Sequence, residues 1–475
     1  MGQEIDRTRF EPEDYIRFGA CLAEETALLA EQEHSGQLSD ECCQIGFEVE
    51  AWLVDRYLLP APRNVEFLAA LDSPLVVPEL SRFNVELNGT PQPLRGQPFA
   101  RLEAELTSTW RHCLDSAHDL GCALVLVGIL PTVREQDLNM ANMSPLKRYR
   151  ALNEQILQLR GGRPLHVDIH GDEHLHTRHG DVMLEAATTS FQVHLQVPAV
   201  QAARYYNASL IASAPVLAAS VNSPFLFEHS LWAETRIPLF EQAVASHAAD
   251  ARPHEGRVNF GNGYLADGVA TLFEENRARF PVLLPMVTPA KPGTFSHLRL
   301  HNGTIWRWNR PLIGFNRDGR THIRIEHRVL PAGPSILDMI ANAAFYTGLA
   351  EGLAHRTPAP ELDIDFDTAR ENFYRAARLG LDAGIRWPGT AAVDACSLIL
   401  EKLLPLARAG LLRLGIDVTE IERTLGVIEA RVRSRQTGAA WQRAWVIAHG
   451  RDFRLLTATY LENQRSGAPV HEWLV

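Results

Sequence analysis

Hydrophobic and polar side chains alternate along the segment QIGFEVEAWLVD, residues 44–55. Phe47 and Val49 alternate with Glu48 and Glu50. Because successive side chains of a β-strand leave opposite faces, this pattern predicts a strand with both glutamates on one face and the apolar residues on the other. Neighbouring like charges repel each other, so the pattern indicates either a face open to water or a positive group between the carboxylates.

The same alternation recurs in three later segments, FNVELNG, SFQVHLQV and THIRIEHRVLP. Their polar faces carry Asn84, Glu86, Asn88, Gln192, His194, Gln196, Arg324, Glu326 and Arg328. An antiparallel sheet with one face in water alternates in the same way. A solvated face usually takes Thr, Lys and Ser, whereas these positions hold carboxylates, arginines, an imidazole and amides. The joint pattern therefore favours a functional face over a merely solvated one.

Two further segments add predicted strands. In SHLRLH, His297, Arg299 and His301 alternate with two leucines, and the Asn302–Gly303 pair follows before TIWRW. An Asn-Gly pair between two alternating runs predicts a β-hairpin. The apolar run CALVLVGIL, residues 122–130, is too short to span a membrane and predicts a buried strand.

Helical patterns occupy the two ends of the chain. Residues 12–34 are predicted to be helical, and after Pro331 the sequence is almost wholly helical. The segment DVTEIERTLGVIEARVRSR contains a T-x-x-E capping box, Thr419 to Glu422, at a predicted helix start. We expect an α+β fold, with a catalytic antiparallel sheet and flanking helices in residues 1–334. Residues 335–475 are expected to form a helical C-terminal part packed on the same domain.

The composition and the absence of certain motifs argue against several classes of function. The chain has 475 residues, 46% of them hydrophobic, and a formal net charge of −11. The mild acidity and the lack of a basic stripe argue against nucleic acid as a partner. The N-terminus carries charges and no signal-peptide core, so we expect a cytoplasmic protein without membrane segments. The sequence has neither a P-loop nor a G-x-G-x-x-G motif after a strand, so a nucleotide must bind in another way.

The residue types on the polar face point to phosphate chemistry. Several carboxylates with an imidazole suit Mg²⁺ or Mn²⁺ shared with phosphate groups. Arginines on the same face offer bidentate recognition of phosphate or carboxylate. Phosphoryl transfer depends mostly on such positioning and charge neutralisation.

These segments also carry a resemblance to a known family. GFEVE, FNVELNG, TTSFQVHLQV, VNSPF followed by LWAETR, and IRIEHRVLP occur in the order found in glutamate–cysteine ligase family 2. The chain resembles this family, which includes bacterial carboxylate–amine ligases and has a glutamine-synthetase-like catalytic sheet, over roughly residues 40–350. The resemblance implies that Arg328 and Glu326 are catalytic and that the metal ligands are Glu48, Glu50, Glu86, His194 and Glu326.

The resemblance further implies ATP-dependent amide formation through an acyl phosphate. A carboxylate, most simply that of glutamate, and an amine would be the substrates, ATP the co-substrate and Mg²⁺ or Mn²⁺ the cofactor. Arg328 would stabilise the transferred phosphoryl group, and another arginine would hold the substrate's α-carboxylate. The expected substrate or nucleotide contacts are Asn88, Gln192, Asn222, Arg236, Arg299, Arg310, Arg324 and Trp308. A homo-oligomer is also expected.

Other interpretations stay open. The chain could be a non-catalytic homologue that binds metal or nucleotide to regulate a partner, or a guanidino-type phosphotransferase. The histidine-rich segment 166–179 is expected to be a loop or substrate lid rather than a metal site, because its spacing fits no standard zinc pattern. Trp306 and Trp308 could line either a pocket or the core. Lys147 and Arg148 are expected at an exposed helix start, with a phosphate contact as the alternative.

Overall fold

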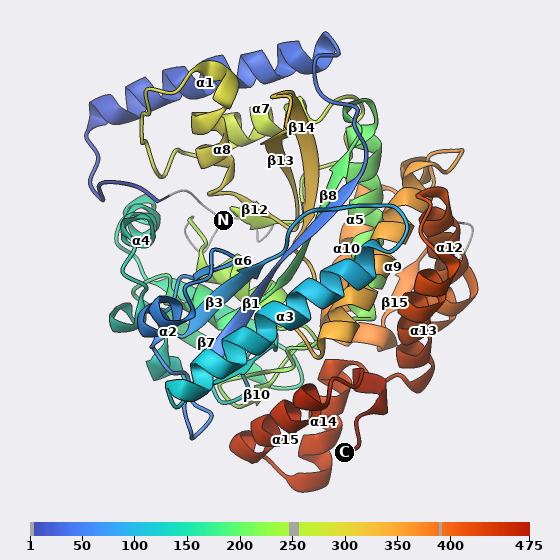
Figure 1. Cartoon of the computed structure of the whole chain (residues 1–475). Coiled ribbons are helices and arrows are strands. Elements are labelled where there is room, and N and C mark those ends of the chain that lie inside the picture. The colour runs from blue at the N-terminus through green and yellow to red at the C-terminus, as the bar shows by residue number, and fades with distance from the viewer. Residues whose placement is uncertain (1–3, 247–255, 389–391) are drawn as a thin grey trace.

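The protein, described by a computed structural model for residues 4–246, 256–388 and 392–475, is built around one antiparallel sheet (Figure 1). The strand order is β13-β14-β8-β1-β3-β2, and the short strands β4 and β5 also pair with β1. The bounds are β1 Gln44–Val54, β2 Val76–Pro78, β3 Asn84–Asn88, β4 Gln92–Pro93, β5 Ala123–Val125, β8 Phe191–Val197, β13 Asn309–Phe315 and β14 Thr321–His327.

The four strands predicted to carry the polar face are β1, β3, β8 and β14, and the sheet brings them together. In the register, Glu50 lies opposite Glu86, and His194 lies opposite Glu326. The polar face is not open to water, since Glu48 is only 9% exposed and Glu326 only 1%. This burial favours the interpretation of the polar face as a functional face over that of a solvated face.

Helices cover both faces of the sheet. Helices α5 and α9 pack against β8, β13 and β14, and α9 is the centre around which α12 and α13 pack. Almost every residue of α5 and α9 is buried, as expected of a helix enclosed on all sides. Residues of α4, α7 and α8 border the polar face, and α1 packs across α7 and α8 (Figure 1).

The helices are α1 Pro12–His34, α2 Asn64–Leu71, α3 Pro98–Asp119, α4 Lys147–Leu159, α5 Ala202–Ala218, α6 Arg236–Ala243, α7 Ala270–Arg279, α8 Ser296–Asn302, α9 Ile336–Ala354, α10 Phe366–Leu379, α11 Ala395–Leu398, α12 Leu404–Arg413, α13 Val418–Ser434, α14 Gly438–His449 and α15 Phe453–Ser466. Small two-stranded sheets pair β6 Leu165–His170 with β7 His174–His179, β9 Phe225–Leu226 with β10 His229–Ser230, β11 Val258–Asn259 with β12 Trp306–Arg307, and β15 Gly384–Arg386 with β16 Ala392–Asp394. None of the helices in the described ranges is long and apolar enough to cross a bilayer.

The predicted hairpin around Asn302–Gly303 is wrong. SHLRLH forms helix α8, and its buried residues His297, Leu298 and His301 follow helical rather than alternating spacing. The Gly303 N–H donates to the carbonyl of Arg299, which continues the helical hydrogen-bonding pattern to the end of the segment. So short a run fits both periods, and only packing decides between them.

Three other local predictions are corrected. The segment 166–179 is a hairpin, β6 and β7, and not a loop. Helix α13 begins after Asp417, so Thr419 lies inside its first turn and caps nothing. In the run 122–130 only Ala123–Val125 is a strand, although Leu124 to Val127 are completely buried as predicted.

Candidate active site

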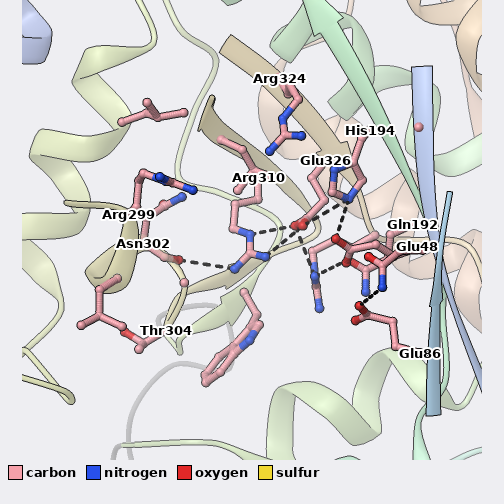
Figure 2. A pocket seen from close by; sticks show the side chains of 18 of the residues that line it. Glu48, Glu86, Gln192, His194, Arg299, Asn302, Thr304, Arg310, Arg324 and Glu326 are labelled. Atoms are coloured by element: carbon pink, nitrogen blue, oxygen red, sulfur yellow. Dashed lines mark hydrogen bonds and ion pairs between the residues drawn. The ribbon is translucent and has the colours of Figure 1, made fainter. Parts of the chain in front are cut away.

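A cavity of about 840 Å³ lies over the polar face of the sheet (Figure 2). Strands β1, β3, β8, β13 and β14 form its floor, and residues of α4, α7 and α8 form its walls. Of the residues predicted from the sequence, the cavity lining includes Glu48, Glu50, Glu86, Asn88, Gln192, His194, Arg299, Arg310, Arg324, Glu326 and Arg328. For the residues on β1, β3, β8 and β14 the alternation is sufficient to place the side chains on one face, because the buried apolar face behind them fixes the register. Arg299 reaches the cavity from helix α8 and Arg310 from β13.

The first acidic group consists of Glu48, His194 and Glu326, whose ligand atoms lie within 4.8 Å of one another. Nε2 of His194 is 3.5 Å from Glu48 Oε1 and 3.6 Å from Glu326 Oε1. This nitrogen is buried and has no hydrogen-bond partner among the described residues. Burial lowers the pKa of His194, which keeps the imidazole neutral and able to coordinate a cation.

The second acidic group consists of Glu50, Glu79 and Glu86, also within 4.8 Å of one another. Burial raises the pKa of Glu50 and of Glu79 to about 7 each. Burial and the nearby carboxylate of Glu48 raise the pKa of Glu86 well above its usual range. Three carboxylates so close together repel one another when ionised, and a divalent cation removes that repulsion.

Hydrogen bonds hold the second group in place. The Ser190 N–H donates to Glu50 Oε2 at 2.7 Å, and Gln192 Nε2 donates to Glu50 Oε1 at 3.1 Å. Asn88 Nδ2 donates to Glu86 Oε1 at 2.9 Å. Asn88 and Gln192, predicted as substrate contacts, thus orient carboxylates in this structure.

Both groups fit divalent cations. Carboxylate oxygens with one neutral imidazole suit Mg²⁺ or Mn²⁺, and the unpartnered Nε2 of His194 faces the carboxylates of the first group. The five ligands predicted from the sequence are divided between the groups: Glu48 belongs to one and its strand neighbour Glu50 to the other.

Arginines surround Glu326. Arg310 forms a bidentate pair with it: Nε donates to Oε2 at 2.7 Å and Nη2 donates to Oε1 at 2.9 Å. Arg328 Nη1 donates to Glu326 Oε2 at 3.2 Å and to Gln192 Oε1 at 2.5 Å. Although burial opposes it, the charges of Arg310 and Arg328 lower the pKa of Glu326, so its carboxylate is ionised. A bidentate pair of this kind is strong and directional.

The sequence comparison decides the family at this point. Residues 44–456 match the family described as glutamate–cysteine ligase family 2. The chain belongs to this family. This membership confirms the family that the sequence resembles and places the chain among the ATP-dependent carboxylate–amine ligases.

A solved structure shares the predicted α+β fold, an antiparallel sheet with flanking helices. A glutamate–cysteine ligase from Francisella tularensis, in complex with AMP, has a TM-score of 0.57 and 12% identity, over 90% of each chain. At this identity the likeness shows the fold alone. A bifunctional glutathione synthetase from Pasteurella multocida has a TM-score of 0.48 and 11% identity over 94% of this chain and 55% of that one, and we draw nothing from it. A comparison with curated proteins finds no significant match.

Asn222 and Arg236, predicted as contacts of substrate or nucleotide, do not line the cavity. Both bind the buried carboxylate of Glu234, Asn222 through its N–H at 2.8 Å and Arg236 through Nε at 3.2 Å. Arg236 also donates to the carbonyl oxygens of Arg328 and Val329. Arg236 therefore fixes the backbone that carries Arg328, which is a positioning role. The Asn222 side chain donates instead to the carbonyl oxygen of Ala332 and to the Tyr460 hydroxyl.

Trp308 also lies outside the cavity. Its ring is completely buried, and Nε1 donates to Glu241 at 2.9 Å. Its neighbour Trp306, half-buried, lines the cavity instead. Two residues apart in one regular strand, both rings would share a face. The strand is interrupted between them, since β12 ends at Arg307 and β13 begins at Asn309 in a different sheet.

Arg299 and Arg324 are the predicted arginines whose charge stays available to a ligand. Within the part of the chain that the structure describes, neither forms a salt bridge, whereas Arg310 is committed to Glu326. Figure 2 shows Arg299, Asn302 and Thr304 on the far side of Arg310 from Glu48 and Glu86. The cavity thus has an acidic end and an end with a free positive charge.

Sequence reasoning missed several lining residues. Glu79 completes the second acidic group, and Glu185 adds another carboxyl, whose pKa burial raises to about 8. Arg148 was expected at the surface but is 6% exposed and lines the cavity beside Tyr149. Glu79 follows the short strand β2 and Glu185 lies in a 3₁₀ turn, so neither sits in a periodic segment that could have revealed it.

Proposed function

We propose that this member of glutamate–cysteine ligase family 2 joins the side-chain carboxylate of glutamate, or of a closely related acid, to an amine with consumption of ATP. The observation that carries the proposal is the pair of acidic groups beside Arg328 on one buried sheet face. Six ligand residues in two groups of three supply the charge needed to hold two divalent cations against a triphosphate.

In the proposed reaction, a carboxylate oxygen of the donor acid attacks the γ-phosphorus of ATP. A P–O bond forms, the bond to ADP breaks, and an acyl phosphate results. The amine then attacks the acyl carbon, inorganic phosphate leaves, and the nitrogen loses a proton. Bound cations would neutralise phosphate charge during the first step.

The chain's own residues have distinct proposed roles. Arg328, held by Gln192 and Glu326, stabilises charge on the transferred phosphoryl group. Arg299 or Arg324 binds the α-carboxylate of the donor, because both reach the cavity without a salt-bridge partner among the described residues. Arg310 keeps Glu326 ionised and oriented toward His194.

Release of inorganic phosphate tests the proposal. Full-length protein with ATP and Mg²⁺ is assayed with glutamate against a panel of amines, and Glu326→Gln is run in parallel. We expect release that needs both glutamate and one class of amine and is lost in the variant. ATP binding without release for any pair would favour the regulatory reading, and transfer of phosphate to a guanidino compound would favour a phosphotransferase.

A further inference from the structure

Most histidines of the β6–β7 hairpin lie on its outer face, whereas His179 lies on the buried face. Along both strands buried and exposed residues alternate, with Val167, Ile169 and Leu175 on the buried side. The outer face carries His166, Asp168, His170, His174, His176 and Arg178. A solvated strand face rarely needs so many imidazoles, and none of these residues lines the active-site cavity.

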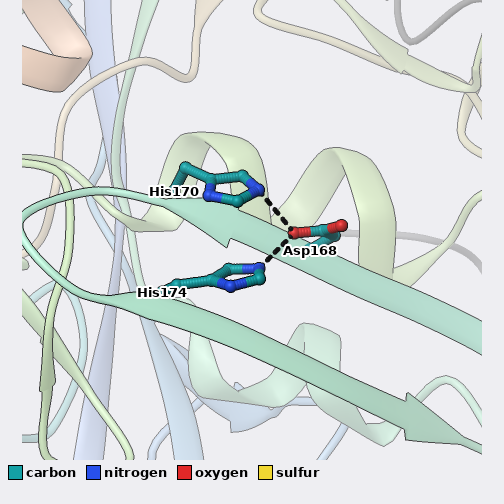
Figure 3. A group of neighbouring side chains, drawn as sticks. All are labelled: Asp168, His170 and His174. Atoms are coloured by element: carbon teal, nitrogen blue, oxygen red, sulfur yellow. Dashed lines mark hydrogen bonds and ion pairs between the residues drawn. The ribbon is translucent and has the colours of Figure 1, made fainter.

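Three of these side chains converge near the turn (Figure 3). His170 and His174 are direct cross-strand partners, and their rings stack with centroids 3.9 Å apart. Nε2 of His170 lies 3.2 Å from Asp168 Oδ1, and Nε2 of His174 lies 2.7 Å from the same oxygen. The three ligand atoms lie within 4.8 Å of one another.

The hairpin is fixed to the body of the protein, so its backbone is already in place for a ligand. The Asp168 N–H donates to Gln242 Oε1 at 2.7 Å, and Trp232 Nε1 donates to the carbonyl oxygen of His170 at 2.9 Å. A Cβ at Gly171 would lie 2.4 Å from the backbone of Leu231, so the turn of the hairpin packs tightly against the segment that carries Leu231. Only the three side chains must move to bind an ion.

We propose that Asp168, His170 and His174 bind one divalent transition-metal ion of the zinc class. Two imidazole nitrogens and a single carboxylate oxygen match the preferences of Zn²⁺, whereas Mg²⁺ favours sites made mostly of oxygen ligands. Zinc–ligand distances of about 2.0–2.1 Å require a modest opening of the Asp168–His174 contact, which exposed side chains allow. Water would complete the coordination, and the ion would link β6 to β7 across the turn.

Calorimetric titration with Zn²⁺ tests this site in the full-length protein. An excess of Mg²⁺ is present throughout to occupy the carboxylate groups of the cavity. The variants are His170→Ala/His174→Ala and Asp168→Asn, and the matched control is His118→Ala, which removes an imidazole from the exposed side of α3. Titration with Co²⁺, followed by visible absorption, reports the ligand field directly.

The wild type and His118→Ala should bind one more equivalent of Zn²⁺ than the double variant. Asp168→Asn should weaken that equivalent at least about tenfold. The Co²⁺ absorption of this equivalent should disappear with the two histidines. Equal stoichiometry and affinity in the wild type and the double variant would overturn the proposal, and so would Co²⁺ spectra that do not differ. Because the three residues are exposed, the metal-free variants should unfold at the wild-type temperature, which separates lost binding from misfolding.

Discussion

Arg310 provides the sharpest test of how the site is built, because sequence and structure assign it different tasks. The sequence predicts a contact with substrate, whereas the structure commits both arms of Arg310 to Glu326. Arg310→Met keeps most of the side-chain volume and removes the charge. The variant leaves Glu326, which is 1% exposed, with one arginine fewer.

The expected cost follows from this burial. Removing one partner of a buried ion pair costs about 3–5 kcal/mol of unfolding free energy, because the other charge is left uncompensated. Arg328 also contacts Glu326, at 3.2 Å, so the lower end of this range is expected. In a Glu326→Gln background the same change should cost only about 1–2 kcal/mol, since the carboxylate that pairs with Arg310 is no longer present. Mg²⁺ should stabilise Arg310→Met more than the wild type by supplying a replacement positive charge.

Urea unfolding of the four proteins of this cycle, with and without Mg²⁺, measures these differences. Arg299→Met is the matched control, because Arg299 lines the same cavity without a salt-bridge partner in the described ranges. It should leave stability within about 0.5 kcal/mol of the wild type and raise the KM for the donor acid. If Arg310→Met is as stable as the wild type and changes only KM, Arg310 contacts substrate and does not stabilise the ionised Glu326.

The remaining predictions concern single residues. Glu79→Gln should raise the Mg²⁺ concentration needed for half-maximal phosphate release at least about tenfold, and an unchanged Mg²⁺ dependence would remove Glu79 from the second acidic group. Arg328→Lys should lower kcat by about 100- to 1000-fold, measured as ATP-dependent phosphate release, and a change in KM alone would contradict its role at the transferred group. Burial raises the pKa of Glu241 from 4.5 to about 7, so the folded protein retains a proton there and stability is lost as pH rises from the unfolded to the folded pKa. Glu241→Gln, which can still accept hydrogen bonds from Trp308 and Tyr374, should therefore gain about 2–3 kcal/mol relative to the wild type between about pH 5 and about pH 8. Urea unfolding at both pH values checks this, and a pH-independent difference would contradict it.

The strands of the polar face could be predicted because the alternation of polar and apolar residues is strong and lies within each segment. Side chains alternate with a period of two, and a buried apolar face fixes the register, so Glu48, Glu86 and His194 had to share a face. The partition of the ligands could not be predicted in the same way. It depends on which strands are neighbours, and β1 lies between β8 and β3 only in the folded sheet.

The failures have one physical origin, since a motif states which residues occur and not which side of the backbone they occupy. Asn222 and Arg236 belong to motifs that resemble the family, yet neither lines the cavity. The Arg236 side chain binds Glu234, and the Asn222 side chain binds Ala332 and Tyr460. Arg310 pairs with Glu326 because β13 and β14 place them opposite each other, and no sequence pattern predicts this register. Glu79 lies beside Glu86 because β2, which it follows, pairs with β3, and no sequence pattern predicts that pairing.

The central claim is that a carboxylate is activated as an acyl phosphate, and isotope transfer tests it most directly. Glutamate labelled with ¹⁸O in its side-chain carboxylate is turned over with ATP, Mg²⁺ and the active amine, and the released phosphate is analysed by mass spectrometry. Attack of the carboxylate on the γ-phosphorus predicts one ¹⁸O atom in each phosphate released. Amide product accompanied by unlabelled phosphate would show that the carboxylate never bonded to phosphorus and would contradict the account.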